Sequence, residues 1–151
     1  KAPDFELDSS KGGKLKLSSL KGKNVLINFY IMDFNPSWIT HLQASGSDEN
    51  YAKFQAENTE VLGMSINTAF SQKAFADFAK INYPLLSDGT GKTMTAFGVF
   101  DQERRQAKRS YIIIDKEGVV RYLNIRPGNG PADILSTETL LNEVKKVNKG
   151  S

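Results

Sequence analysis

Cysteine is absent from all 151 residues of this chain. The chain can therefore form no disulfide bond, offer no thiolate to a metal and carry out no thiol redox chemistry. Histidine is almost as scarce, because His41 is the only one. One histidine without cysteines or clustered carboxylates makes a poor metal site. We therefore expect neither a metal nor another cofactor.

Long apolar runs and concentrated charge are also lacking. The longest apolar segments, at 25–30 and 111–114, have the length of strands, far short of the roughly 20 residues that cross a bilayer. Lysine and arginine number 20 against 17 acidic residues, a net charge of +3 that is scattered along the chain. Nucleic-acid-binding proteins usually gather their positive charge on one face. We expect neither a membrane nor a nucleic acid as a partner.

What the chain does contain is typical of a globular domain, with 39% hydrophobic and 25% charged residues. No repeat or biased linker divides it, so we expect a single domain over residues 1–151, with 148–151 as a flexible tail. The chain begins at Lys1 rather than Met, which indicates a processed or trimmed protein. Composition does not fix the compartment; we favour the cytoplasm, with an exported precursor as the alternative.

Strand patterns and helix patterns alternate along the chain. Two short alternating segments at 5–7 and 15–17 predict an N-terminal hairpin. Compact apolar runs predict further strands at 25–30, 61–66, 85–86, 111–114 and 119–125.

Helices are expected between these strands. They begin at Pro36 (with an interruption at 45–48), at Ser71 as the cap of 72–80, around Met94, and near Ser136. In the second of them Phe75, Phe78 and Ala79 form an apolar stripe. This order predicts an α/β fold of the thioredoxin-like type: a three-layer α/β/α sandwich with a mixed central sheet and an N-terminal β-hairpin.

A series of short motifs runs in order from residue 2 to about residue 123. They occupy residues 2–7, 20–25, 29–36, 61–66, 70–75, 83–88, 96–99 and 109–118. Among them are Ala-Pro-Asp-Phe at the start, Phe-Tyr-x-x-Asp-Phe-x-Pro at 29–36 and Pro-Leu-Leu-Ser-Asp at 84–88. Together they resemble the peroxiredoxins, the AhpC/TSA branch of the thioredoxin-fold superfamily, with the PrxQ and AhpE-like groups nearest. Arg109-Ser110 stands where thioredoxins place a cis-proline.

The resemblance implies where a catalytic site would lie. In that family a Pro-x-x-x-Thr-x-x-Cys motif and one arginine reduce peroxide. The cysteine is activated as a thiolate at a helix N-terminus beside the arginine. Aligned on Asp33, the four positions are Ile31, Asn35, Trp38 and Arg109. Tryptophan offers one N–H donor and no nucleophile, so the thiol mechanism is impossible and only Arg109 is retained.

Three replaced positions favour natural divergence over an engineered knock-out, which would change the cysteine alone. Arg109 has two interpretations. It could bind a small anion beside the first turn of the helix at Pro36, or it could pair with a carboxylate or stack on Trp38, which we favour. Asn35, Trp38 and Arg109 are the candidate binding residues. We expect Trp38 to serve in packing or in partner contact.

Three functions remain open. The leading one is a non-catalytic pseudoenzyme that binds a protein partner or forms a homodimer. The second is a different chemistry at the same cleft, with Asn35, His41 and Arg109 holding a small polar or anionic substrate; a ligand-dependent thermal shift abolished by Arg109→Ala would support it. The third is the antioxidant oxidoreductase activity that homology alone would assign.

Overall fold

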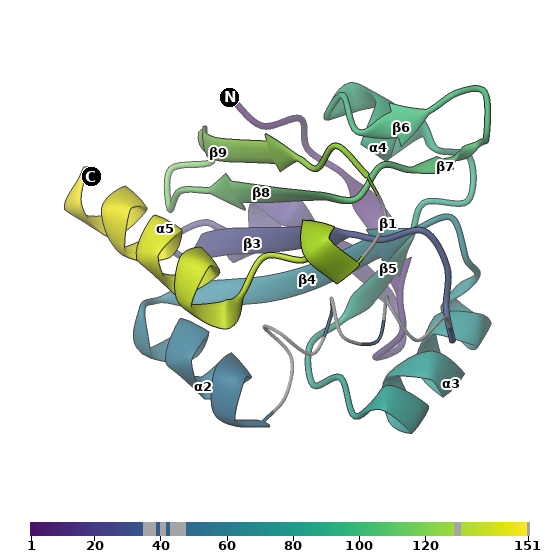
Figure 1. Ribbon diagram of the computed structural model, residues 1–151, viewed down its shortest axis with the longest axis horizontal. Coiled ribbons are helices and arrows are strands. Elements are labelled where there is room, and N and C mark those ends of the chain that lie inside the picture. The colour runs from purple at the N-terminus through teal and green to yellow at the C-terminus, as the bar shows by residue number, and fades with distance from the viewer. Residues whose placement is uncertain (35–38, 40–41, 43–47, 129–130, 151) are drawn as a thin grey trace.

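The computed structural model describes residues 1–34, 39, 42, 48–128 and 131–150. Their centre is a seven-stranded sheet with the order β2-β1-β5-β4-β3-β8-β9 (Figure 1). The strands span Glu6–Ser9 (β1), Lys14–Lys16 (β2), Asn24–Phe29 (β3), Thr59–Ser65 (β4), Leu85–Ser87 (β5), Ser110–Ile114 (β8) and Val120–Ile125 (β9). β3, β4 and β5 run parallel, whereas β8 is antiparallel to both β3 and β9. The mixed sheet and the N-terminal hairpin β1–β2 confirm the predicted architecture.

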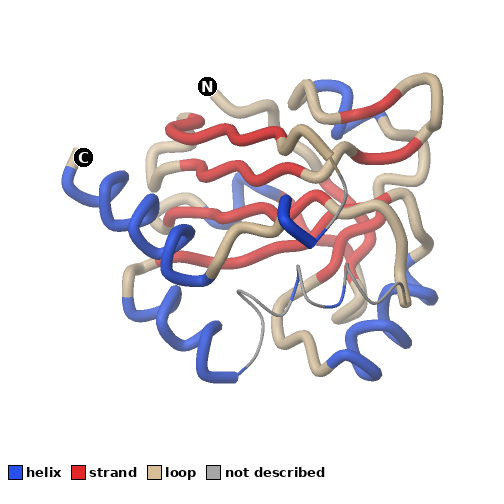
Figure 2. The backbone as a smooth tube through the Cα atoms, in the orientation of Figure 1, coloured by secondary structure: helices blue, strands red, loops and turns tan. Residues whose placement is uncertain are grey.

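Helices cover both faces of this sheet (Figure 2). The helices α2 (Asp48–Ala56), α3 (Ala69–Ala79) and α5 (Thr137–Lys149) contribute to one apolar core. The short helix α4 (Lys92–Ala96) and the 3-10 helix η1 (Leu17–Leu20) contribute to the other. Every residue of β3 and β8 is buried. Strands covered on both faces are nearly continuous apolar runs in the sequence, which is why these two were predictable.

The described helices agree with the predicted ones in number and order but not in every detail. α3 begins at Ala69, and its cap is Thr68, whose side chain accepts a hydrogen bond from the Ser71 N–H at 3.2 Å. The prediction of Ser71 as the cap is therefore wrong. Phe75 and Ala79 are buried, but Phe78 is 68% exposed. Phe78 lies beside the buried face of α3, which is formed by residues 72, 75, 76 and 79.

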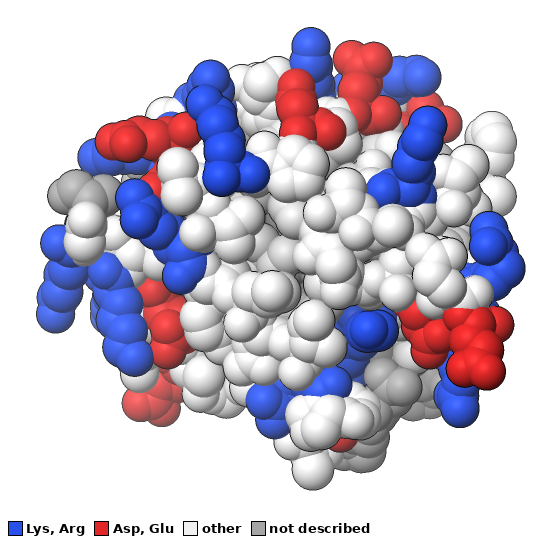
Figure 3. Space-filling view, turned by 90° about the horizontal axis from the view of Figure 1, so that it is seen from above, with Lys and Arg blue, Asp and Glu red and all other residues white. Residues whose placement is uncertain are grey.

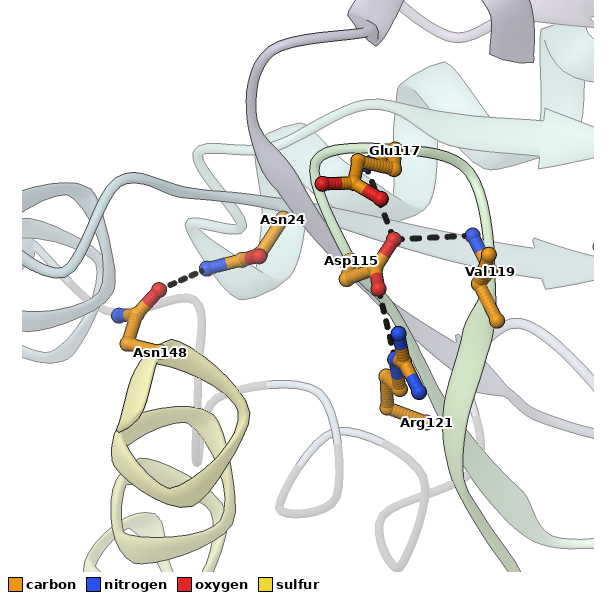
Figure 4. A network of polar contacts seen from close by, with 6 residues as sticks. All are labelled: Asn24, Asp115, Glu117, Val119, Arg121 and Asn148. Carbon is orange, nitrogen blue, oxygen red and sulfur yellow. Dashed lines mark hydrogen bonds and ion pairs between the residues drawn. The ribbon is translucent and has the colours of Figure 1, made fainter. Parts of the chain in front are cut away.

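The C-terminal helix was predicted more closely. Ser136 is its N-cap, and its hydroxyl oxygen accepts from the Thr139 N–H at 3.1 Å. The helix continues to Lys149, so the boundary of the predicted tail, at residue 148, lies too early. Asn148 is held in place because its side-chain oxygen accepts from Asn24 at 2.7 Å (Figure 4) and its amide donates to the Glu57 carbonyl at 3.0 Å.

Three small elements were not predicted: η1, the 3-10 helix η2 (Pro131–Asp133), and a hairpin of β6 (Phe100–Asp101) and β7 (Gln106–Ala107). In the helix expected from Pro36, Ile39 and Leu42 are helical, and α2 begins at Asp48; the interruption falls largely outside the described residues. No helix in the described part of the chain is long and apolar enough to span a bilayer.

Candidate functional site

Two of the predicted site residues lie at the same end of the central sheet. Ile31 follows β3 and is buried, and Arg109 precedes β8 and is 1% exposed. Phe29 of β3 pairs directly with Ser110 of β8. Because the strands are antiparallel neighbours, the residue after one and the residue before the other emerge at one edge. Asn35, Trp38 and His41, the other candidates, lie outside the described residues.

Arg109 is buried and has polar and charged neighbours. Burial lowers the pKa of its guanidinium, and the nearby Tyr111 and Asp133 act in the opposite direction. Asp133 also lies 4.0 Å from the guanidinium of Arg126, and the backbone N–H of Arg126 donates to the Arg109 carbonyl at 2.9 Å. The negative charge that Asp133 supplies favours the interpretation in which Arg109 interacts with a carboxylate of the chain.

Asp33 is the centre of a hydrogen-bond network at this edge. Its carboxylate accepts from the Tyr30 hydroxyl at 2.8 Å and from the Ser71 hydroxyl at 2.6 Å. Its backbone N–H donates to the Asn67 side chain at 3.2 Å. The three partners come from the end of β3, the start of α3 and the loop between β4 and α3. Asp33 therefore ties the segment after β3 to α3.

The network continues into the interior through Ser65 and Gln72, which are both buried. The Ser65 hydroxyl donates to the Asn67 side chain at 3.0 Å. The Gln72 amide donates to the Ser65 hydroxyl at 3.0 Å and to the Leu86 carbonyl at 2.7 Å. The contacts of Asp33 thus rest on groups that are fixed in the core, and such linked groups hold one geometry more firmly than isolated pairs.

Phe34, the next residue of the same segment, is also held against α3. Its φ angle is +66°, in the left-handed region that a bulky side chain rarely adopts. Its ring lies 5.3 Å from the ring of Phe75 and 5.6 Å from that of Phe78 on α3. These contacts and the bonds of Asp33 hold a conformation that costs energy, a feature that clusters at functional sites.

The chemistry available here is polar and acidic. Partial burial raises the pKa of Asp33, although the hydrogen bonds from Ser71 and Tyr30 act to lower it. Burial also raises the pKa of Tyr30 well above its ordinary value, so its hydroxyl stays protonated and remains a donor to the carboxylate. Among the described residues, no three His, Cys, Asp or Glu side chains gather as a metal site would require. The arrangement positions the backbone of Asp33 and keeps the Tyr30 hydroxyl protonated. It supplies no thiol nucleophile.

The charge on Asp33 gives the protein a measurable pH dependence. Its folded pKa is raised above 3.8, so the folded state binds more protons in that window, and stability falls as pH rises through the folded pKa. Replacing Asp33 with Asn removes the titration. The free energy of unfolding of the unaltered chain minus that of Asp33→Asn should fall as pH rises above 4 and then level off, as measured by urea denaturation.

The variant Ser71→Ala provides the matched control for that prediction. The Ser71 hydroxyl lowers the pKa of Asp33, so its removal should move the fall to higher pH. An unchanged difference across the whole range for Asp33→Asn would show that the carboxylate is not partly desolvated as described.

The whole sequence, and not the site alone, is similar to known proteins. It matches the AhpC/TSA family over residues 1–123. The chain belongs to the AhpC/TSA family. The peroxiredoxin resemblance drawn from the motifs is thereby confirmed, and this family member has no cysteine at any of its 151 positions.

Relatives of this AhpC/TSA chain include several peroxiredoxins. The chloroplastic 2-Cys peroxiredoxin BAS1 of Spinacia oleracea is 35% identical over 136 residues, 83% of this chain and 51% of the relative. The chloroplastic peroxiredoxin Q of Triticum aestivum is 35% identical over 122 residues, 80% of this chain and 55% of the relative. The chain thus spans about half the length of these curated relatives.

Two solved structures are similar to this chain. The AhpC of Enterococcus faecalis has a TM-score of 0.88 at 29% identity, covering 99% of this chain and 90% of that one. The reduced 2-Cys peroxiredoxin of Plasmodium vivax has a TM-score of 0.86 at 25% identity, covering 99% and 95%. The thioredoxin-like α/β fold is therefore that of the peroxiredoxins.

Proposed function

We propose that this AhpC/TSA-family chain is a pseudoenzyme that acts by binding, through association with a second copy of itself. One observation carries the first half of this proposal: the chain contains no cysteine. The motif alignment supports it, because that alignment assigns Trp38 to the position of the peroxidatic cysteine. A thiolate is the nucleophile of the family reaction. Without it the first step, attack on the peroxide oxygen, has no agent.

The rest of the molecule keeps what a binding protein needs. The central strands are fully buried, and the edge around Ile31 and Arg109 is held by internal hydrogen bonds. A rigid scaffold with a silenced site can present its surface to a partner at little entropic cost.

The surface that we assign to self-association is the outer strand β9. It is an edge strand of the sheet, and an edge offers unpaired N–H and C=O groups to another strand. Its residues alternate between half-buried and exposed, and two of the exposed ones are apolar: Leu123 is 50% exposed and Ile125 is 40% exposed. Figure 3, viewed from above and so from the side on which β9 lies in Figure 1, shows a broad uncharged area with charged side chains around it.

A two-fold axis makes this strand complementary to itself. In an isologous pair, two antiparallel copies of β9 would extend the sheet across the interface and bring the apolar side chains of both copies together. The same symmetry makes any charge introduced there face its own copy, which gives a direct test.

Molecular mass in solution tests the proposal. Light scattering or sedimentation equilibrium should show the 16.7 kDa chain associating to a dimer as its concentration rises. Leu123→Lys should shift the protein to the monomer, because like charges would then meet across the axis. The matched control is Phe70→Lys, an equal change on α3 at a residue that is 89% exposed, and it should leave the mass unchanged. A monomer at every concentration, or disruption by the α3 change instead, would refute self-association through β9.

A further inference from the structure

A pocket lies at the other end of the sheet from Ile31 and Arg109. It opens at Val25, the second residue of β3, and at Ile114, where β8 ends, and the N-terminal segment and η1 form its sides. Its volume is about 140 Å³. The family site described above uses none of its residues.

The wall of this pocket is mainly apolar. Ala2, Leu17, Leu20, Val25 and Ile114 line it, and three of these (Leu17, Val25 and Ile114) are buried members of the second core. A cavity of ~150 Å³ lined by aliphatic and aromatic side chains holds a molecule of the size of benzene. The pocket therefore has room for one small apolar body, of the size of a six-membered ring.

The rim is charged, and its acidic groups are already engaged. One oxygen of Asp4 accepts from the N–H groups of Phe5 at 2.9 Å and Ser18 at 3.0 Å. Desolvation opposes these bonds, but the pKa of Asp4 is lowered overall, so the group stays ionised and bound to the backbone.

Asp115 is engaged even more fully. Its carboxylate accepts from the N–H groups of Glu117 and Val119 and from the Arg121 guanidinium at 2.7 Å (Figure 4). Its negative charge is thus matched by Arg121. The Asp115 carboxylate forms its bonds within the β8–β9 hairpin. It therefore does not pair with the basic groups at the pocket mouth.

The basic groups of the rim, unlike Asp115, take part in none of the ion pairs between described residues. Lys21 and Lys23 are exposed and line the pocket, together with Lys1. The mouth of an apolar pocket is therefore bordered by ammonium groups, each a strong donor to an anionic oxygen.

We propose that this pocket binds a small organic carboxylate, with its apolar body against Leu17, Val25 and Ile114 and its carboxylate at Lys21 and Lys23. The apolar wall selects against inorganic anions, which would have to give up water without gaining polar partners. The basic rim selects against neutral apolar molecules of the same shape. The proposal is independent of self-association through β9.

A fluorinated probe tests the proposal directly. In ¹⁹F NMR titrations of the full chain, 4-fluorobenzoate should show saturable line broadening. The neutral 4-fluorobenzyl alcohol, of nearly the same shape, should bind about tenfold more weakly or not at all, because it lacks the charge-assisted bonds. Equal binding of acid and alcohol, or no binding of the acid, would overturn the proposal.

Two double variants locate the probe. Lys21→Gln with Lys23→Gln should weaken 4-fluorobenzoate binding about tenfold. Lys11→Gln with Lys14→Gln removes the same charge from the exposed β1–β2 turn and should leave binding unchanged. All four side chains are exposed, so both proteins should fold, which circular dichroism checks. Undiminished binding in the Lys21/Lys23 variant would place the probe elsewhere and refute the site.

Discussion

Substitution of Ile31→Pro, Asn35→Thr and Trp38→Cys together should create a peroxide-reactive thiol in a chain that has none. The change returns the nucleophile and the two neighbours that the family motif pairs with it. Arg109 remains buried at the same edge of the sheet as residue 31, where its charge can lower the pKa of a nearby thiol. The thiolate would attack one peroxide oxygen and become a sulfenic acid, and the second oxygen would leave as water or an alcohol. Mass spectrometry after dimedone trapping measures this product.

The single variant Trp38→Cys is the control for this gain. It supplies the thiol while Ile31 and Asn35 stay in place, so it lacks both the shielding proline and the hydroxyl donor of the family motif. Loss of one such donor typically slows a reaction by about a hundredfold or more. The triple variant should therefore form sulfenic acid much faster than the single one. A triple variant with native circular dichroism and no trapped product would show that the site has lost more than these three side chains.

Replacement of Asp115 by Ala should be among the most destabilising single changes outside the apolar cores. The Asp115 side chain is 1% exposed and accepts from two backbone N–H groups and one guanidinium in the β8–β9 turn. The carboxylate is buried and its three hydrogen bonds are part-buried. At about 1 kcal/mol for each lost bond, the free energy of unfolding should fall by about 3 kcal/mol. Urea denaturation at neutral pH measures it.

The same carboxylate gives a second signature, in acid. Burial alone would raise its pKa, but the Val119 N–H, Arg121 and the Glu117 N–H lower it overall, below 3.8. A group with a depressed folded pKa stabilises above its unfolded pKa, and the effect is lost as pH falls through the folded value. The difference between the unaltered chain and Asp115→Ala should therefore shrink below pH 4.

Asp101 offers a matched control for the Asp115 prediction. It also accepts from two backbone N–H groups, those of Glu103 at 3.1 Å and Arg104 at 3.0 Å, but in an exposed turn. Water can replace it there, so Asp101→Ala should cost about 1 kcal/mol. Equal losses for the two variants would contradict the role of burial at Asp115.

The buried strands could be predicted from the sequence because their signal is local. β3 and β8 are mainly apolar runs, and Ser136 precedes a clear helical stripe, so each pattern indicates its element without help from the rest of the chain. The β6–β7 hairpin has two residues in each strand, too few for any alternation to appear. The cap of α3 could not be identified from the neighbouring sequence, since Thr68 and Ser71 are both residue types that cap helices. In the fold, the Ser71 hydroxyl donates to Asp33, which lies in another part of the chain.

The candidate site was predictable only in part, because some of its contacts join residues that are distant in the sequence. Aligning a motif located Ile31 and Arg109, and the sheet register brings them to one edge. The role of Asp33 was missed, although it belongs to the motif at 29–36. Its partners Tyr30, Asn67 and Ser71 come from different parts of the sequence and meet only in the fold. No spacing rule reveals such a convergence.

Peroxide consumption by the purified, unaltered chain is the most direct measure of whether the peroxidase site has been abandoned. The assay follows hydrogen peroxide in the presence of excess dithiothreitol, with a protein-free blank. Because the chain contains no cysteine to supply the thiolate nucleophile, the rate should equal that of the blank at every protein concentration. Consumption that rises in proportion to protein concentration would contradict the proposal that this chain is a pseudoenzyme.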